Sequence, residues 1–162
     1  MSAADVLTVE PRRYDSAEVQ ALVESVQQEY VERYGGPDAA QVDPAQFEPP
    51  DGLFLVGLLD GQPVATGGWR RLPGGDAELK RMFVVTAARR RGIARALLAE
   101  LERSAANAGI SRLVLNTGLE QPEAIRLYES SGYTPVPGFG HYADAPRALF
   151  YGKELSRDFS RG

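Results

Sequence analysis

The chain has 162 residues, 43% of them hydrophobic, which is enough for one domain with a sizeable core. Its net charge of −4 argues against general nucleic-acid binding, which needs a basic surface. The absence of cysteine excludes disulfides, thiolate zinc sites and a cysteine nucleophile, and a single histidine is too little for a zinc hydrolase or a serine triad.

The amino-terminal residues predict neither export nor membrane insertion. They lack the basic and apolar regions of a signal peptide, and no apolar run in the chain approaches the roughly 20 residues that a membrane span needs. Without repeats, a low-complexity tract or a linker, residues 1–162 are expected to form a single domain. We therefore expect a cytoplasmic protein with neither a nucleic-acid nor a membrane partner.

The first half of the chain predicts one helix and four strands. An apolar helical pattern follows the capping-box pair Asp15 and Glu18 and is expected to end near Gly35-Gly36. The polar, proline-rich stretch 37–50 predicts a long loop with one short helical turn. Runs of apolar and β-branched residues predict strands over residues 6–9, 53–59, 63–72 and 77–85. Glycine-containing turns separate the last three of these strands, at 60–61 and 73–76.

The second half predicts two helices and three strands. One helix begins near Ile93 and stops at Gly109, and the other begins at Pro122, which suits a first turn, and ends at Gly132. Strands are predicted over residues 112–117, 133–136 and 148–155. Between the last two strands lies a loop rich in glycine, proline and aromatic residues, 137–146.

A short basic loop joins the fourth predicted strand to the next helix. Its arginines precede a glycine, and one more follows in the helix: Arg89, Arg90, Arg91, Gly92 and Arg95. Between positions 77 and 95, six basic side chains stand against one acidic one, in a chain that is acidic overall. A helix start offers unpartnered backbone N–H groups and a positive dipole end, and glycine lets an anion approach the backbone. The pattern predicts a seat for a doubly charged group such as a pyrophosphate; an exposed, ligand-free arginine loop is the alternative.

Two segments resemble the GNAT family of N-acetyltransferases. The spacing Arg89-x-x-Gly92-x-Ala94 after a strand is similar to the acetyl-CoA-binding signature of the family, Gln/Arg-x-x-Gly-x-Gly/Ala. The segment from Ala124 to Tyr133 is similar to the Ala-x-x-Leu-Tyr-x-x-x-Gly-Phe/Tyr segment of the family. The resemblance implies the GNAT fold. This is an α/β domain with a mixed, mostly antiparallel seven-stranded sheet, flanked by about four helices and splayed between strands 4 and 5.

The resemblance also implies an enzyme that moves an acetyl group from acetyl-CoA to a primary amine of a small molecule. Direct attack in a ternary complex is expected, without a metal. In the family the pantetheine arm of the donor enters where strands 4 and 5 splay, and the Val84 N–H would polarise the thioester carbonyl. The cofactor-binding positions implied are Phe83, Val84, Val85, Arg89, Arg90, Arg91, Gly92, Ile93, Ala94, Arg95, Asn116 and Tyr128. Asn116 would bind the arm or cap the segment that follows it.

Two side chains are the candidates for catalysis. By the resemblance, Tyr128 would hydrogen-bond the cofactor sulfur and stabilise or protonate the departing thiolate; the alternative is a buried core aromatic. A lysine-like ammonium must lose a proton before attack, which calls for a base or a water chain. Glu78 resembles the position at which many family members carry a base glutamate, just before a bulge in strand 4. The alternative is a solvated carboxylate paired with Lys80 or Arg81, in which case His141 or a water chain could serve.

The acceptor and the oligomeric state stay open at this point. A shallow groove would favour a protein lysine or amino terminus as acceptor, whereas a pocket closed by 37–50 and 137–146 would favour a small molecule. Trp69 and Arg70, on the third predicted strand, are candidates to line that pocket. The alternative for each is packing in the core or on the surface. A non-catalytic acyl-CoA sensor is the alternative from another class, and an acyl group larger than acetyl also fits. Dimers are common in the family, so the resemblance allows a homodimer.

Overall fold

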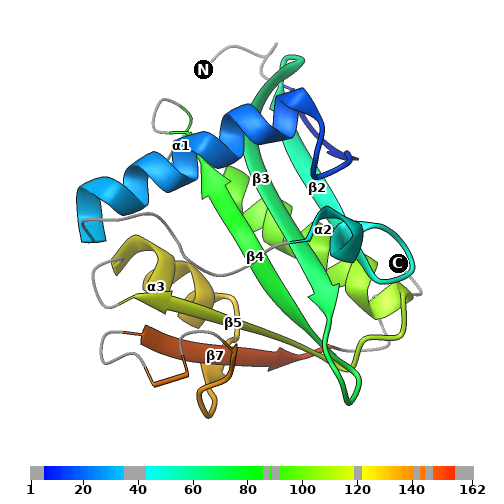
Figure 1. The fold of residues 1–162 in the computed structure, drawn as a ribbon, viewed down its shortest axis with the longest axis vertical. Helices are drawn as coiled ribbons and strands as arrows, with labels where there is room; N and C mark the ends of the chain where they lie inside the picture. Colours follow the sequence, from blue (N-terminus) through cyan, green and yellow to red (C-terminus); the bar gives the residue numbers. More distant parts are fainter. Residues whose placement is uncertain are drawn as a thin grey trace.

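Seven strands form one mixed sheet in the computed structural model of the chain (Figure 1). The structure describes residues 6–34, 43–85, 88, 92–118, 122–140, 143–144 and 148–155. The strands are β1 (Leu7–Pro11), β2 (Gly52–Leu59), β3 (Gln62–Arg71), β4 (Asp76–Val84), β5 (Arg112–Gly118), β6 (Thr134–Pro135) and β7 (Ala148–Glu154). Their order across the sheet is β1-β2-β3-β4-β5-β7-β6, and β4 with β5 is the one parallel pair among them. The predicted sheet is therefore confirmed.

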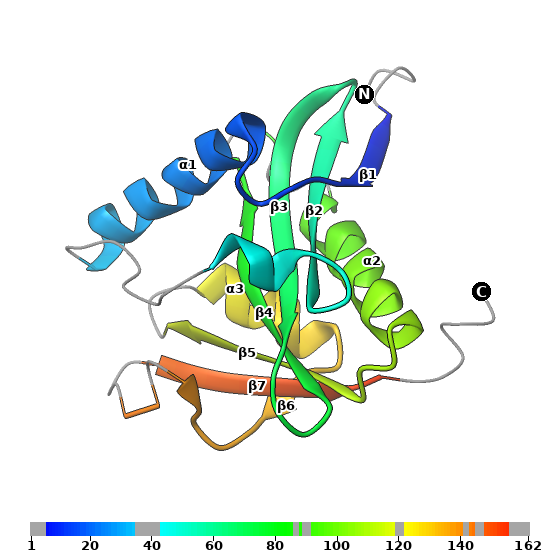
Figure 2. The same cartoon turned by 45° about the vertical axis from the view of Figure 1, so that its right-hand side comes forward.

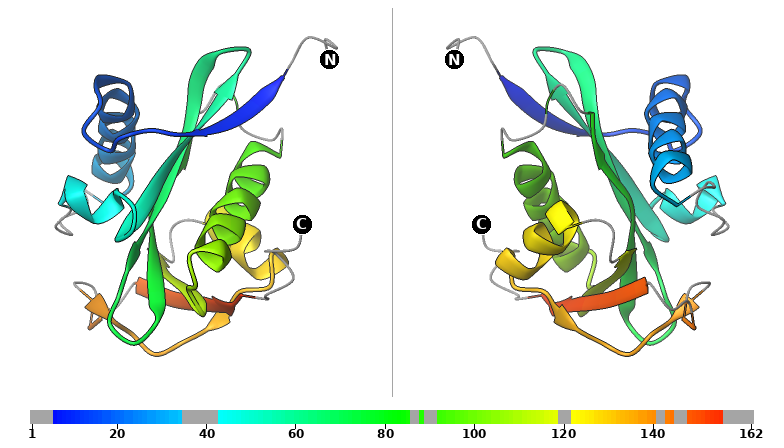
Figure 3. Two further views of the ribbon diagram at one scale, coloured as in Figure 1. Left: turned by 90° about the vertical axis from the view of Figure 1, so that its right-hand side faces the viewer. Right: turned by 90° about the vertical axis from the view of Figure 1, so that its left-hand side faces the viewer.

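Helices cover both faces of this sheet. The described residues form α1 (Ala17–Tyr34), the 3-10 helix η1 (Pro44–Phe47), α2 (Ile93–Asn107) and α3 (Pro122–Ser130). Figure 3 shows α1 and η1 on one face and α2 and α3 on the other. The described residues thus form three α-helices and one 3-10 turn, close to the expected number of about four. The proline-rich stretch 37–50 contains one short helical turn, η1, as predicted. No helix in the described ranges is both long and apolar enough to cross a membrane.

The residue that caps α1 is Ser16, one position later than the predicted cap Asp15. The Ser16 hydroxyl accepts the Val19 N–H at 3.3 Å, whereas the carboxylates of Asp15 and Glu18 form ion pairs with nearby arginines. The predicted capping pair is wrong because arginines compete for both carboxylates. Serine fills the same role in the next position.

Apolar side chains fill the spaces on both faces of the sheet. Under α2 and α3, the buried core includes Leu97, Leu101, Leu113, Leu115 and Tyr128. Under α1 and η1, three aromatic rings contact one another: Tyr14, Phe47 and Phe54, with centroids 5.0 to 5.4 Å apart. Contact between two aromatic rings stabilises the fold beyond the contribution of their buried apolar surface. The sheet is thus fixed from both sides, and α1 and η1 are held to it by the smaller core.

The sheet opens between β4 and β5. Their parallel pairing begins at Asp76 and Arg112 and ends at Glu78 and Val114, although β4 continues to Val84 and β5 to Gly118. Figures 1 and 2 show the two strands diverging beyond this point. The predicted splay between strands 4 and 5 is confirmed.

A bulge in β4 lies beside the opening. Along β3, Thr66 faces Phe83 but Gly68 faces Lys80, so one extra residue of β4 is accommodated between them. Arg81 lies in this bulge and has a positive φ of 60°. Its carbonyl oxygen accepts a hydrogen bond from the Thr66 hydroxyl at 2.7 Å. A bulge re-aims the backbone that follows it. Glu78 therefore lies before the bulge, as predicted, and the end of β4 lies after it.

Candidate active site

The end of β4 directs one backbone amide into the opening. The Val85 N–H donates to the Val64 carbonyl of β3 at 2.8 Å. Amides of successive residues in an extended strand point to opposite edges, so the Val84 N–H points away from β3, toward the β5 side. The Val85 carbonyl accepts the Ala88 N–H at 2.9 Å, so both backbone groups of Val85 already have internal partners. Of the predicted backbone positions, Val84 has the orientation that a ligand in the opening requires.

The amino terminus of α2 follows from the conformation of Gly92. This residue has φ 76° and ψ 10°, in the left-handed region that favours glycine, and it caps the helix without a side chain. An added Cβ would meet no described atom within 4 Å. The first turn contains Ile93, which is buried in the core, and Ala94. Its backbone N–H groups have no acceptor inside the helix, and the helix dipole adds positive charge there.

The predicted arginines are placed only in part. Arg89, Arg90 and Arg91 lie outside the described residues, as does His141. The Arg95 guanidinium contacts the end of α3, donating to the Ser131 hydroxyl at 3.2 Å and to the Ser130 hydroxyl at 2.7 Å. Arg95 thus ties the start of α2 to the end of α3, a structural contact that the sequence pattern did not predict.

Tyr128 lies on α3 in a buried aromatic pair. It is 6% exposed, and its ring meets the Tyr133 ring edge-on at a centroid distance of 5.6 Å. The Tyr133 hydroxyl donates to Glu102 Oε2 at 2.9 Å, and Lys153 donates to Glu102 Oε1 at 2.9 Å. Burial, followed by the Glu102 carboxylate, raises the pKa of Tyr133 well above its ordinary value. This network fixes the ring against which Tyr128 packs.

Asn116 lies on the part of β5 that no longer pairs with β4. It is two residues beyond Val114, the last β5 residue paired with β4, and it faces Phe150 of β7. Since residues i and i+2 of a strand share a face, its side chain lies on the same face as those of Val114 and Glu78. The structure thus brings Asn116 to the opening, half-buried.

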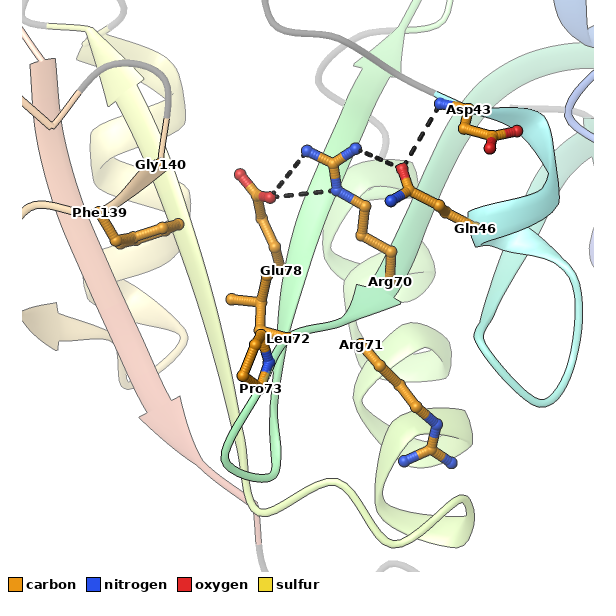
Figure 4. A pocket seen from close by; sticks show the side chains of 9 residues that line it. All are labelled: Asp43, Gln46, Arg70, Arg71, Leu72, Pro73, Glu78, Phe139 and Gly140. Carbon is orange, nitrogen blue, oxygen red and sulfur yellow. Dashed lines mark hydrogen bonds and ion pairs between the residues drawn. The ribbon is translucent and has the colours of Figure 1, made fainter.

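A pocket of about 620 Å³ lies at the lower end of the opening (Figure 4). It is lined by Asp43, Gln46, Arg70, Arg71, Leu72, Pro73, Glu78, Phe139 and Gly140. These residues come from both segments expected to border the acceptor, 37–50 and 137–146, and from β3 and β4. The Phe139 ring is held edge-on against Phe150, with centroids 5.2 Å apart. The pocket is therefore walled by two loops and floored by strands.

Glu78 is the buried carboxylate of this pocket, and its partner is Arg70. The Arg70 Nε and Nη2 donate to Glu78 Oε1 at 3.2 and 3.0 Å, and Nη1 donates to Gln46 Oε1 at 2.9 Å. The side chain of Glu78 is 10% exposed and that of Arg70 14%. The alternative of a solvated carboxylate paired with Lys80 or Arg81 does not describe this contact, because the partner comes from β3 and both groups are largely buried.

Two neighbours of Arg70 on β3 do not contact Glu78. Trp69, also considered for the pocket, is 2% exposed and donates its indole N–H to the Ser104 hydroxyl. Arg71 lines the pocket, but its guanidinium points away from Glu78 (Figure 4) and bonds the carbonyls of Pro50 and Ala108. Of the two arginines, Arg70 is therefore the one that pairs with Glu78.

The sequence pattern missed the Arg70–Glu78 pair. Counting outward from the predicted turn at 73–76 places Arg71, not Arg70, opposite Glu78. The observed turn is one residue shorter, because Leu72 bonds Asp76, and this register pairs Arg70 with Glu78. Gln46 carries no sequence signal either. Its position depends on η1 docking against the sheet, which is a tertiary contact.

Comparison with known proteins agrees with this geometry. The sequence profile of the acetyltransferase (GNAT) family matches residues 19–133. An IAA acetyltransferase of Azospirillum brasilense is 41% identical over 107 residues, which are 65% of this chain and 70% of that protein. The human N-acetylaspartate synthetase is 33% identical over 106 residues, 65% of this chain but only 35% of its own length.

A solved structure shares the whole arrangement. It is a proposed acyl-CoA N-acyltransferase from Klebsiella pneumoniae, with a TM-score of 0.79 and 27% identity, covering 93% of this chain and 99% of its own. Fold, profile and relatives together define the class of protein, an acyltransferase enzyme. The chain belongs to the acetyltransferase (GNAT) family.

Proposed function

We propose that this enzyme transfers an acetyl group from acetyl-CoA to a primary amine of a small molecule, by direct attack in a ternary complex. The observation that carries the proposal is the opening between β4 and β5. It begins at Glu78, in the pocket, and leads along β4 to Val84, after which the chain enters α2. A carboxylate suited to an amine, a backbone amide suited to a thioester and a helix start suited to a pyrophosphate therefore follow one another along the chain from β4 to α2.

The donor side of the proposal rests on backbone groups. The Val84 N–H would stabilise the oxyanion that develops on the thioester carbonyl, an effect worth about 3 kcal/mol in comparable sites. The N–H groups of the first α2 turn, at Ile93 and Ala94, would bind the pyrophosphate together with the arginines before Gly92. Asn116, at the opening, would bond the pantetheine arm.

The acceptor side rests on the pocket. Its volume of about 620 Å³ lies within the range of small-molecule sites. It is lined by Gln46 from one loop segment and Phe139 from the other, and we expect two bordering loops for a small acceptor rather than a protein surface. The two curated relatives named above, for IAA and for N-acetylaspartate, also point to small molecules.

The proposed reaction needs two proton transfers. Glu78 accepts one proton from the bound ammonium, which frees the nitrogen lone pair. The nitrogen then attacks the carbonyl carbon, the new C–N bond forms, and the C–S bond breaks with its electron pair going to sulfur. The Tyr128 hydroxyl donates a hydrogen bond to the departing thiolate. The second nitrogen proton leaves as the adduct collapses, so the products are the amide, the thiol of coenzyme A and one proton.

The test is release of free coenzyme A thiol from acetyl-CoA in the presence of a panel of small primary amines and lysine peptides. We expect turnover with a small amine and none with the peptides. Turnover with peptides alone would instead support a protein acceptor. Tight binding of acetyl-CoA without turnover of any amine would contradict the proposal and support an acyl-CoA sensor.

A further inference from the structure

The Glu78 carboxylate is held by one oxygen only. Both Arg70 nitrogens that contact it, Nε and Nη2, donate to Oε1. Within the part of the chain that the structure describes, Oε2 has no hydrogen-bond partner, although the side chain is only 10% exposed. Figure 4 shows Oε2 directed away from Arg70, toward the side of the pocket on which Phe139 lies. An oxygen that faces the pocket can accept a hydrogen bond from a donor group of a ligand.

Arg70 is itself fixed by the turn that precedes β2. Its Nη1 donates to Gln46 Oε1 at 2.9 Å. The same oxygen accepts the Asp43 N–H at 3.4 Å, as half of the capping box of η1, so the Gln46 side chain is anchored to the turn. Phe47 anchors η1 to the sheet, because its side chain is buried in the aromatic core under α1 with 1% exposure. A rigid chain of contacts therefore runs from η1 through Gln46 and Arg70 to Glu78.

We propose that Gln46 and Arg70 are positioning residues that present Oε2 of Glu78 to the ammonium of the acceptor. A fork that bound both carboxylate oxygens would occupy a lone pair on each, whereas the observed contact engages Oε1 and leaves both lone pairs of Oε2 for the pocket. The proton that Glu78 takes from the acceptor is thus received on Oε2. This inference rests on the proposed function, because it assigns an orientation to the base of that reaction.

The position of Gln46 makes the proposal testable without breaking the buried ion pair. Removing Arg70 would strand the Glu78 charge, and such a loss can prevent folding. Gln46 is exposed, so Gln46→Ala keeps the Arg70–Glu78 contact and removes the hydrogen bond between Gln46 and Arg70. Gln46→Glu keeps an oxygen that can accept from both Arg70 and the Asp43 N–H. Glu48→Gln is the matched control, because Glu48 lies beside the same turn and contacts Arg13 instead, at 3.4 Å.

The experiment measures steady-state kinetics with an amine that the parent enzyme acetylates. In Gln46→Ala, kcat/KM for the amine is expected to fall about tenfold, since a small misplacement of a reacting group is costly. The KM for acetyl-CoA and the melting temperature should not change. Gln46→Glu should recover most of the lost activity, and Glu48→Gln should match the parent. Equal amine kinetics in the parent and Gln46→Ala, or equal losses in Gln46→Ala and Glu48→Gln, would overturn the inference.

A spectroscopic measurement separates this inference from the proposed function. The Nε–H proton of Arg70, identified by its loss in Arg70→Lys, should exchange slowly with solvent in the parent and faster in Gln46→Ala. Unchanged exchange would overturn the positioning by Gln46 even if no amine were acetylated. Faster exchange together with no turnover of any amine would support the positioning and contradict the proposed function.

Discussion

The two halves of the proposed site are built in different ways. The donor half consists of the Val84 amide, the α2 start at Gly92 and Tyr128, all within regular elements or at their ends. The acceptor half consists of side chains from well-separated parts of the chain, with Gln46 from η1, the Arg70–Glu78 pair from neighbouring strands and Phe139 from the loop after β6. A backbone site depends on local chain geometry, which a short motif can encode. A side-chain site depends on how distant elements pack.

The largest effect should come from the acceptor half. Glu78→Gln keeps the shape of the side chain and an oxygen for Arg70, but it removes the proton acceptor. Loss of a general base typically costs 10²- to 10⁴-fold, so we expect kcat to fall by about 100-fold or more. Steady-state assays with saturating acetyl-CoA measure this, and acetyl-CoA affinity should be unchanged.

The matched control for this variant is Asp76→Asn, the same change of carboxylate to amide on the same strand. Asp76 pairs with Arg112 of β5 at 2.8 Å and does not line the pocket. Its turnover should match that of the parent. A similar loss in both variants would show that the effect comes from disturbing β4 and would contradict a base role for Glu78.

The next effect should come from the chemical step in the donor half. Tyr128→Phe removes the hydroxyl proposed to stabilise the thiolate while keeping the buried ring, and we expect kcat to fall at least about tenfold with acetyl-CoA affinity nearly unchanged. Tyr151→Phe is the control, because its hydroxyl also contacts α3, donating to Glu129 at 3.1 Å. Parent-like turnover in Tyr128→Phe would remove this tyrosine from the mechanism.

A change at the start of α2, in the donor half, should weaken the affinity for acetyl-CoA. Gly92→Val forces a β-branched residue into φ 76°, which costs on the order of 1–3 kcal/mol and shifts the helix start. We expect about tenfold weaker binding of acetyl-CoA, measured by isothermal titration. Gly109→Val is the control, since Gly109 has φ 85° just beyond the other end of α2 and an equally open surrounding. Equal losses of affinity in the two variants would mean that helix stability, rather than the anion seat, decides binding.

The difference between the halves also explains what the sequence could predict. Strand and helix positions follow from apolar periodicity, and the splay follows from the family resemblance, so β1 to β7 appear close to their predicted ranges. Glu78 and Tyr128 could be proposed from the sequence because each lies in a local segment that resembles the family pattern. The Arg70–Glu78 contact was not predicted, because the turn between β3 and β4 is one residue shorter than the predicted 73–76 and this sets the register.

Other features could not be predicted because they depend on competition or on tertiary docking. The cap of α1 fell to Ser16 because arginines bind the carboxylates of Asp15 and Glu18. Gln46 reaches Arg70 only because Phe47 anchors η1 in the aromatic core. Arg95 has a basic side chain at a helix start, yet its contact is with α3. In each case the residue type allows several partners, and packing selects one.

The smallest effect should appear in stability rather than catalysis, beneath the donor half. Tyr133→Phe removes one of the two hydrogen bonds described for Glu102, which is 4% exposed, and leaves the bond from Lys153, at a cost of about 1–2 kcal/mol at pH 7. Because burial and Glu102 raise the pKa of Tyr133, the folded chain keeps this proton above pH 10, where an unfolded tyrosine releases it. The free energy of unfolding should therefore fall with rising pH above 10, by up to about 1.4 kcal/mol per unit for this group. Urea unfolding between pH 9 and 11 should show a shallower fall of the unfolding free energy with pH in Tyr133→Phe than in the parent. Equal slopes would contradict the buried network, and an altered amine KM in Tyr133→Phe would show that the two halves are coupled.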